Sequence, residues 1–231
     1  MSQIKEQSEP LRYERKFLIT DYSHSDVEQI LKFHPACFSE IFHQRMVNNI
    51  YFDTFGMNNF YDNIDGEIKR TKVRIRWYDN LFGSVQKPIL EYKMKKGLMG
   101  KKESFELRPF IIDTTFNKAQ ITSALNTDAV PRNIKNEVLS LVPTLLNSYT
   151  RKYFLSADKN FRITIDHYLT YYKIGYVGNT FSNKSVDYNS TVLELKYDSL
   201  LENEAKSVAD VFPFAMTKNS KYLQGLERVF I

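Results

Sequence analysis

Basic residues alternate with apolar residues between residues 69 and 78. The basic set is Arg70, Lys72, Arg74 and Arg76, and the intervening set is Thr71, Val73, Ile75 and Trp77. Alternate side chains of a β-strand share a face, so this stretch predicts a strand with one cationic and one apolar face. Neighbouring like charges repel, and a face of this kind therefore indicates an anion-binding surface.

Five more predicted strands carry polar faces opposite apolar ones. The residues on these faces are Arg12, Glu14 and Lys16, with the apolar Leu18; Glu91, Lys93 and Lys95; Tyr149 and Arg151; Arg162, Thr164 and Asp166; and Glu194 and Lys196. For any single strand, an ordinary half-solvated sheet is the better explanation. Across six strands, the excess of cations favours a charged lumen inside a closed barrel.

The chemistry of such a lumen points to phosphate. Two cations about 6 Å apart repel by about 3 kcal/mol at an effective dielectric constant near 20. A bound polyanion would relieve this repulsion, because arginine makes forked contacts with phosphate and lysine supplies a compact charge. The sequence therefore predicts a row of phosphates held by Lys and Arg.

The predicted elements describe an α+β protein. Strands are expected at 11–19, 46–53, 68–78, 88–96, 101–109, 145–155, 161–173 and 190–198, and helices at 26–34, 57–63, 116–126, 132–141, 202–211 and 218–229. Residues 175–190 are predicted to form a loop, and residues 1–10 a disordered tail. Eight antiparallel strands are enough to close into a barrel with the helices packed outside. We expect residues 11–231 to form a single domain.

Composition narrows the class of protein. The net charge of +5 favours an anionic partner only weakly. Cys37 is the single cysteine, which excludes an internal disulfide. The polar start and the lack of a long apolar run predict a cytoplasmic location. Nucleic acid is not expected as a partner, because Trp77 lies on the face opposite Arg74 and Arg76, and a stacking platform needs aromatics beside the cations.

Nine segments together resemble a known family. They are Tyr13–Phe17, Asn49–Thr54, Lys72–Tyr78, Leu90–Lys93, Gly100–Glu103, Ser148–Tyr153, Arg162–Asp166, Val192–Lys196 and Thr217–Tyr222. In this order they resemble the polyphosphate polymerase domain of the vacuolar transporter chaperone (VTC) family, within the triphosphate tunnel metalloenzymes. The resemblance implies an eight-stranded tunnel that binds ATP or another triphosphate, or a polyphosphate chain.

The resemblance also implies roles for individual residues. The catalytic set is Arg74, Arg76, Lys93, Arg151 and Glu194, with Glu194 holding Mn²⁺ or Mg²⁺. The remaining phosphate-binding residues are Lys16, Lys72, Lys102, Tyr149, Arg162, Lys196, Lys218 and Lys221, of which Lys72, Arg162 and Lys196 are added by the face pattern. Lys218 and Lys221 are expected in one helix, pointing to one tunnel mouth. A transport role would require a separate membrane-protein partner.

Departures from the hydrolytic branch leave the activity open. That branch begins with Glu-x-Glu-x-Lys, and the corresponding positions here are Arg12, Glu14 and Lys16. Fewer acids favour a polyphosphate polymerase-like phosphotransferase that moves the γ-phosphate of ATP to a chain end. The alternatives are a metal-dependent triphosphate hydrolase and a non-catalytic polyphosphate-binding module. Glu194 is alternatively an ion-pair partner of a nearby lysine, and Asp166 is expected to be an ion-pair residue.

Overall fold

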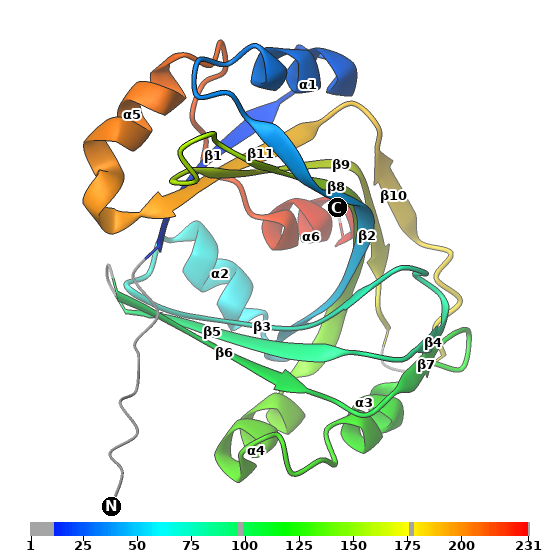
Figure 1. Ribbon diagram of the computed structural model, residues 1–231. Coiled ribbons are helices and arrows are strands. Elements are labelled where there is room, and N and C mark those ends of the chain that lie inside the picture. The colour runs from blue at the N-terminus through cyan, green and yellow to red at the C-terminus, as the bar shows by residue number, and fades with distance from the viewer. Residues whose placement is uncertain (1–11, 97–98, 176–177, 231) are drawn as a thin grey trace, which may run out of the picture. The chain divides into compact units, whose positions relative to one another are not determined.

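The computed structural model describes residues 12–96, 99–175 and 178–230 (Figure 1). These residues form two compact units, which are described separately. Unit 1 comprises residues 12–43, 152–165 and 191–218, and unit 2 comprises the remaining described residues. The tail expected at residues 1–10 lies outside the described residues.

The main sheet has nine antiparallel strands, which confirms the α+β class. Their order is β1 (Arg12–Ile19), β11 (Thr191–Asp198), β9 (Arg162–Lys173), β8 (Val142–Leu155), β2 (Ser39–Asp53), β3 (Lys69–Tyr78), β5 (Ile89–Lys96) and β6 (Met99–Glu106), with β10 (Lys184–Asp187) beside β9. In the described part of the chain this order has two ends, β1 and β6, so closure into a barrel stays a prediction.

Two local predictions about strands were wrong, and one small sheet was not predicted. The segment 175–190 was expected to be a loop, but β10 forms within it because residues 184–187 pair with residues 169–172 of β9. Strand β2 begins at Ser39, seven residues before the expected start. A separate two-stranded sheet of β4 (Gly83–Val85) and β7 (Phe110–Ile112) was not foreseen. Pairing across the chain supplies the hydrogen bonds for these strands, and local sequence patterns do not reveal it.

The core of unit 1 lies between its strands and two helices. Helix α1 (His24–Lys32) has Ser23 as its N-terminal cap and buries Val27 and Leu31. Helix α5 (Glu202–Asp210) follows a single 3₁₀ turn, η1 (Ser199–Leu201). Their apolar sides pack with Phe17, Ile163 and the other inward side chains of β1, β9 and β11. The polar residues that alternate with these side chains therefore point to the opposite face of the strands.

The core of unit 2 contains the apolar face predicted for β3. Val73, Ile75 and Trp77 are almost fully buried. They belong to one cluster with apolar residues of α3 (Lys118–Ala124) and α4 (Arg132–Ser140). Figure 1 shows α3 and α4 below β5 and β6. The cationic residues of β3 consequently face away from this core.

Helix α6 (Lys221–Phe230) packs closely against the sheet of unit 2. A Cβ atom on Gly225 would lie 2.5 Å from side-chain atoms of both Leu145 and Tyr171, so only glycine permits this approach. Lys221 at the start of the same helix contacts Asp166 of β9. Tyr168 between these two β9 positions has a φ of 54°, a backbone irregularity of the kind that shifts side-chain alternation in a strand. Asp166 and Tyr171 can therefore both face α6.

The expected placement of Lys218 was wrong. Helix α6 begins at Lys221, and residues 213–220 have no helical or strand structure. Lys218 therefore does not share a helical face with Lys221. A short helix, α2 (Asn58–Ile64), contacts β3 and α6. No helix among residues 12–96, 99–175 and 178–230 is both long and apolar enough to cross a membrane.

Candidate anion-binding site

The register of unit 2 places the predicted cations of three strands side by side. Lys72 of β3 lies opposite Lys93 of β5, which lies opposite Lys102 of β6. Two residues further along β3, Arg74 lies opposite Glu91. We call the polar residues that follow the cationic face: Lys72, Arg74, Arg76, Glu91, Lys93, Lys102, Tyr149, Arg151, Asp166 and Lys221.

Glu91 lies at the centre of one group of cations on this face. Its Oε2 is 2.5 Å from an Arg74 guanidinium nitrogen and 3.8 Å from an Arg76 nitrogen. Its Oε1 is 2.7 Å from Lys102 Nζ. Burial works to raise the pKa of Glu91, but the charges of Arg74, Arg76 and Lys102 outweigh it and hold that pKa well below its usual range. Glu91 is therefore an ionised carboxylate that neutralises part of the face.

Tyr149 connects Arg76 to a second group of cations. Arg76 donates to the Tyr149 hydroxyl at 3.2 Å, while the Arg151 guanidinium and the Lys221 ammonium lie 5.2 and 5.0 Å from the ring centroid. Burial works to raise the pKa of the Tyr149 hydroxyl, but the charges of Arg151 and Arg76 overcome it and lower that pKa. A phenol whose anionic form is favoured marks a strongly positive environment.

Asp166 neutralises this second group. Arg151 donates two hydrogen bonds to its carboxylate, at 2.5 and 2.6 Å, and Lys221 Nζ lies 2.6 Å from Oδ2. Asp166 is fully buried. Its interpretation as an ion-pair residue is confirmed.

The cationic face changes from exposed to buried along its length. Lys93 is exposed, and the side chain of Lys102 is 50% exposed, whereas that of Arg76 is 11% exposed. Arg151 and Lys221 are buried. A linear polyanion could thus have one end held among buried cations and the rest along the exposed ones.

Unit 1 carries a more balanced polar network. Glu14 lies opposite Lys196 and Lys16 opposite Glu194 in the β1–β11 register. Lys16 Nζ is 3.1 Å from Glu14 and 3.7 Å from Glu194, and Lys196 Nζ is 3.4 Å from Glu194. Glu194 thus lies within ion-pair distance of two lysines, and its role as a metal ligand stays a prediction. Two carboxylates therefore surround one ammonium group.

This carboxylate pair bears on the expected metal. In the part of the chain that the structure describes, no three His, Cys, Asp or Glu side chains are grouped so that they could hold a metal ion. Magnesium, however, is usually bound through one or two carboxylates together with substrate phosphates. Glu194 with Glu14 fits an ion that is shared with a phosphate ligand, and does not fit one held by protein ligands alone.

The other predicted residues of unit 1 are more exposed. Arg162 is exposed at the start of β9, and Lys218 is exposed before α6. In the part of the chain that the structure describes, the ion pairs of Glu194 are with Lys16 and Lys196, and neither Arg162 nor Lys218 is among them. The structure therefore brings together Lys16, Lys196 and Glu194 in unit 1, and the cationic face in unit 2.

Sequence reasoning missed the neutral residues that position these cations. Arg76 Nε donates to Asn49 Oδ1 at 2.9 Å, and Asn49 in turn donates to Asn147 at 3.2 Å. Arg74 donates to the Tyr51 hydroxyl at 3.4 Å. Asn49 and Tyr51 lie two residues apart on one face of β2, so strand periodicity could have revealed them.

Asp53 anchors two helices of unit 2, α2 and α6. Its carboxylate accepts hydrogen bonds from the backbone N–H groups of Asn59 and Phe60 at the start of α2, and from the Tyr222 hydroxyl of α6. Asp53 is fully buried. Because Tyr222 follows Lys221, this contact fixes the first turn of α6 and so helps to place Lys221.

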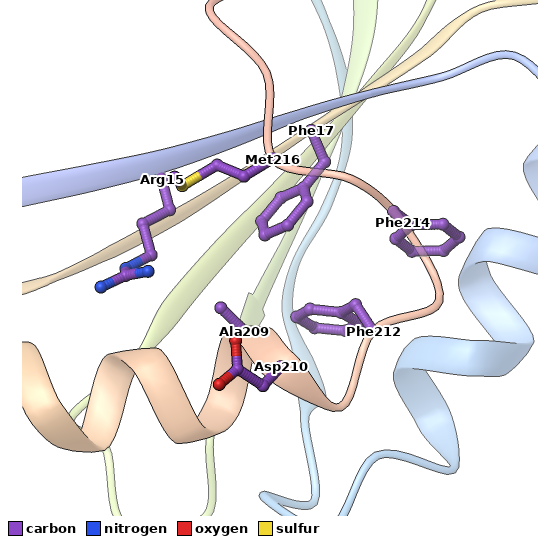
Figure 2. A pocket seen from close by; sticks show the side chains of 7 residues that line it. All are labelled: Arg15, Phe17, Ala209, Asp210, Phe212, Phe214 and Met216. Atoms are coloured by element: carbon purple, nitrogen blue, oxygen red, sulfur yellow. The ribbon is translucent and has the colours of Figure 1, made fainter.

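Unit 1 also contains a pocket of about 400 Å³. Figure 2 shows Phe17, Phe212, Phe214 and Met216 around it, with Arg15 and Asp210 also on its lining. Phe17 and Phe212 belong to the core cluster of this unit. The pocket thus lies on the apolar side of β1, and its lining contains none of the predicted phosphate-binding residues.

The chain matches the family model of the VTC domain over residues 11–230. It therefore belongs to the VTC domain family, and the family inferred from the nine sequence segments is confirmed. No curated protein was found to match the chain.

Two solved structures are similar to the chain at low sequence identity. One is a proposed adenylate cyclase from Vibrio parahaemolyticus, 12% identical, with a TM-score of 0.51, covering 95% of this chain and 99% of the other. The other is the PH1819 protein from Pyrococcus horikoshii OT3, 13% identical, with a TM-score of 0.48, covering 94% of this chain and 96% of the other. The likeness to the Vibrio protein supports the fold alone.

Proposed function

We propose that this protein is a polyphosphate polymerase-like phosphotransferase that moves the γ-phosphate of ATP onto a growing polyphosphate chain. The observation that carries this proposal is the cationic face of unit 2. Its two carboxylates, Glu91 and Asp166, accompany seven cations: Lys72, Arg74, Arg76, Lys93, Lys102, Arg151 and Lys221. Membership of the VTC domain family supports phosphate as the anion.

The excess of cations suits a phosphate chain in particular. Each charge-assisted hydrogen bond to a phosphate oxygen contributes about 1.5–3 kcal/mol, and several along one face add both affinity and alignment. We further propose that the sheet closes into the predicted eight-stranded barrel, so that its polar faces line a tunnel. A tunnel would admit an extended chain and exclude the bulk water that competes for its terminal phosphate.

The proposed reaction is an in-line phosphoryl transfer. A terminal oxygen of the acceptor chain forms a bond to the γ-phosphorus of ATP, the bond from that phosphorus to the β,γ-bridging oxygen breaks, and ADP leaves with the electron pair. Arg74, Arg76, Lys93 and Arg151 bind the triphosphate and stabilise the developing charge. No side chain is required as a general base, because the acceptor oxygen is already anionic.

Further residues hold the donor, the chain and the metal. Lys16 and Lys102 orient the donor; Lys72, Tyr149, Arg162, Lys196, Lys218 and Lys221 bind the remaining phosphates. Glu194, with Glu14, would hold Mn²⁺ or Mg²⁺, which supplies charge neutralisation at the phosphate oxygens. Lys16 would orient the donor from beside these two carboxylates.

The pairing of the carboxylates favours transfer to a chain over hydrolysis. Hydrolysis requires a positioned water, which hydrolytic relatives obtain with several carboxylates. Glu91, Asp166 and Glu194 each contact at least two cations. Their pairing suits these three carboxylates to balance the charge of the cations that they contact.

The test is incubation of the full chain with ATP labelled at the γ-phosphate and Mn²⁺ or Mg²⁺, with the products separated by gel electrophoresis. A ladder of phosphate chains is expected from the wild type and should be lost in Glu194→Gln. Lys152→Gln is the matched control, because Lys152 pairs with Glu28 of α1 and lies next to Arg151 on the opposite face of β8. It should retain the ladder.

Two other results would contradict the proposal. Release of free phosphate without chain growth would establish a triphosphate hydrolase. Tight binding of polyphosphate with neither product, unaffected by Glu194→Gln, would establish a binding module. Binding should weaken in Arg74→Gln under the proposal and under both of these alternatives, because all three use the cationic face.

A further inference from the structure

The hydroxyl of Thr164 is a buried polar group without a hydrogen-bond partner among the described residues. Thr164 lies in β9 and is 3% exposed, and its Oγ1 atom is unsatisfied. Most buried hydroxyl groups in folded proteins have a partner, so each exception calls for an explanation. Within a β-strand, the backbone groups of Thr164 are used by the sheet, and its side chain is left to interact with whatever lies above that face.

The position of Thr164 identifies which face this is. Ile163 and Ile165, its neighbours in β9, belong to the apolar core of unit 1. Thr164 therefore points away from that core, on the same face as Arg162 two residues earlier. Residues two apart in a strand lie about 6.5–7 Å apart, so one extended anion could reach both side chains.

The energetics favour a ligand at this position. A buried hydroxyl without a partner lowers stability relative to a satisfied one, because the desolvation of the hydroxyl is not compensated. Valine would fill the same volume without that penalty. A threonine is therefore unfavourable here in the ligand-free protein and becomes favourable once an acceptor oxygen arrives. Beside the Arg162 guanidinium, the acceptor with complementary charge is an oxyanion.

We propose that the Thr164 hydroxyl donates a hydrogen bond to a phosphate oxygen of the bound chain, beside Arg162. This inference rests on the proposed phosphate-binding function and adds a ligand-contacting residue that charge patterning cannot reveal. The hydroxyl recognises phosphate in general, so inorganic polyphosphate and the triphosphate of a nucleotide are both ligands of this kind.

The experiment compares three variants of the full chain, with tripolyphosphate and ATP as separate probes. Thr164→Val removes the hydroxyl at constant volume, Thr164→Ser retains it, and Thr191→Val is the control. Thr191 is also buried, but its hydroxyl is 2.6 Å from a ring nitrogen of His24 on α1. Affinity is measured by calorimetry, and the melting temperature is measured without ligand.

The proposal predicts opposite effects on stability and binding. Thr164→Val should raise the ligand-free Tm by about 2–4 °C and weaken tripolyphosphate binding about tenfold, which corresponds to about 1.4 kcal/mol. Thr164→Ser should retain the affinity. Thr191→Val should lower the Tm and leave the affinity unchanged. Similar losses for ATP and tripolyphosphate would show that the phosphates are the groups recognised, and a loss confined to ATP would overturn the proposal.

Other outcomes separate the inference from the proposed function. A higher Tm with unchanged affinity in Thr164→Val would show that the hydroxyl has no role in binding. A lower Tm with unchanged affinity would show that bound water satisfies it. If the wild type bound neither probe, the proposed function itself would fail.

Discussion

Glu91 lies directly across the β3–β5 pair from Arg74, with its Oε2 2.5 Å from the Arg74 guanidinium. The carboxylate occupies a position among cations that a phosphate oxygen could also occupy. In the ligand-free protein it offsets the repulsion between Arg74, Arg76 and Lys102. Its removal should therefore affect stability and anion affinity in opposite directions.

We expect Glu91→Gln to lower the stability of the ligand-free protein by about 1–3 kcal/mol, because a mostly buried ion pair loses one partner while Lys102 remains half exposed to solvent. Tripolyphosphate should bind more tightly to this variant than to the wild type, since the internal anion no longer competes. Denaturant unfolding and calorimetry would measure the two effects. Weaker binding would instead show that Glu91 is needed to orient Arg74.

The same pair predicts a dependence of stability on pH. The folded-state pKa of Glu91 lies below its ordinary value of 4.5, so the unfolded state binds the proton more readily. The stabilisation from Glu91 is complete above that ordinary value and is lost as the pH falls through the folded-state pKa. Unfolding measured across this acidic range should show a shallower pH dependence in Glu91→Gln. Equal slopes would contradict the assignment.

Tyr149 should be among the first tyrosines to ionise as the pH rises. Its pKa is lowered by Arg151 and Arg76 despite burial, whereas burial raises the pKa values of Tyr171 and Tyr222. Tyr149→Phe should remove an early step from the ultraviolet titration of tyrosine. Tyr171→Phe is the control and should leave that early step in place. An unchanged early step in Tyr149→Phe would contradict the prediction.

The contact between Asp53 and Tyr222 should contribute to the stability of unit 2. Tyr222→Phe should lower stability by about 1.5 kcal/mol, because one hydrogen bond to a carboxylate is lost. Asp53→Asn should have a larger effect, about 2–3 kcal/mol, because it weakens three backbone hydrogen bonds as well. Chemical denaturation would measure both. The reverse order would show that the tyrosine contact, and not the α2 cap, dominates.

Gly225 should be intolerant of even a methyl group. Gly225→Ala would place its Cβ 2.5 Å from Leu145 and Tyr171, and we expect a loss of about 1–3 kcal/mol despite the better helix propensity of alanine. Displacement of α6 should also weaken tripolyphosphate binding, because Lys221 begins this helix. Glu227→Ala, on the exposed side of α6, should change neither property. Unchanged stability in Gly225→Ala would show that the helix can shift without loss.

Strand periodicity in the sequence was sufficient to predict which residues share the polar and the apolar face of a strand. Alternation along β3 separates Arg74 and Arg76 from Val73 and Ile75, and the structure buries the latter pair. A helix cap at Ser23 or Ser25 was also predictable from local sequence, and the structure selects Ser23, whose side chain accepts a hydrogen bond from the backbone N–H of Asp26. These features depend on residues close together in the sequence. The family was inferred from nine short segments in their order along the chain.

The tertiary structure decided which charges neutralise one another. The pairs Arg151–Asp166 and Lys221–Asp166 join residues 15 and 55 positions apart, and no periodicity predicts such distances. Lys218 was placed in a helix with Lys221 because a helical pattern continues through it, but the helix begins only where Lys221 meets Asp166 and Tyr222 meets Asp53. Local spacing thus determined the composition of each face, whereas long-range strand and helix packing determined the partners and burial of its charges, because these depend on chain segments that approach only in the folded protein.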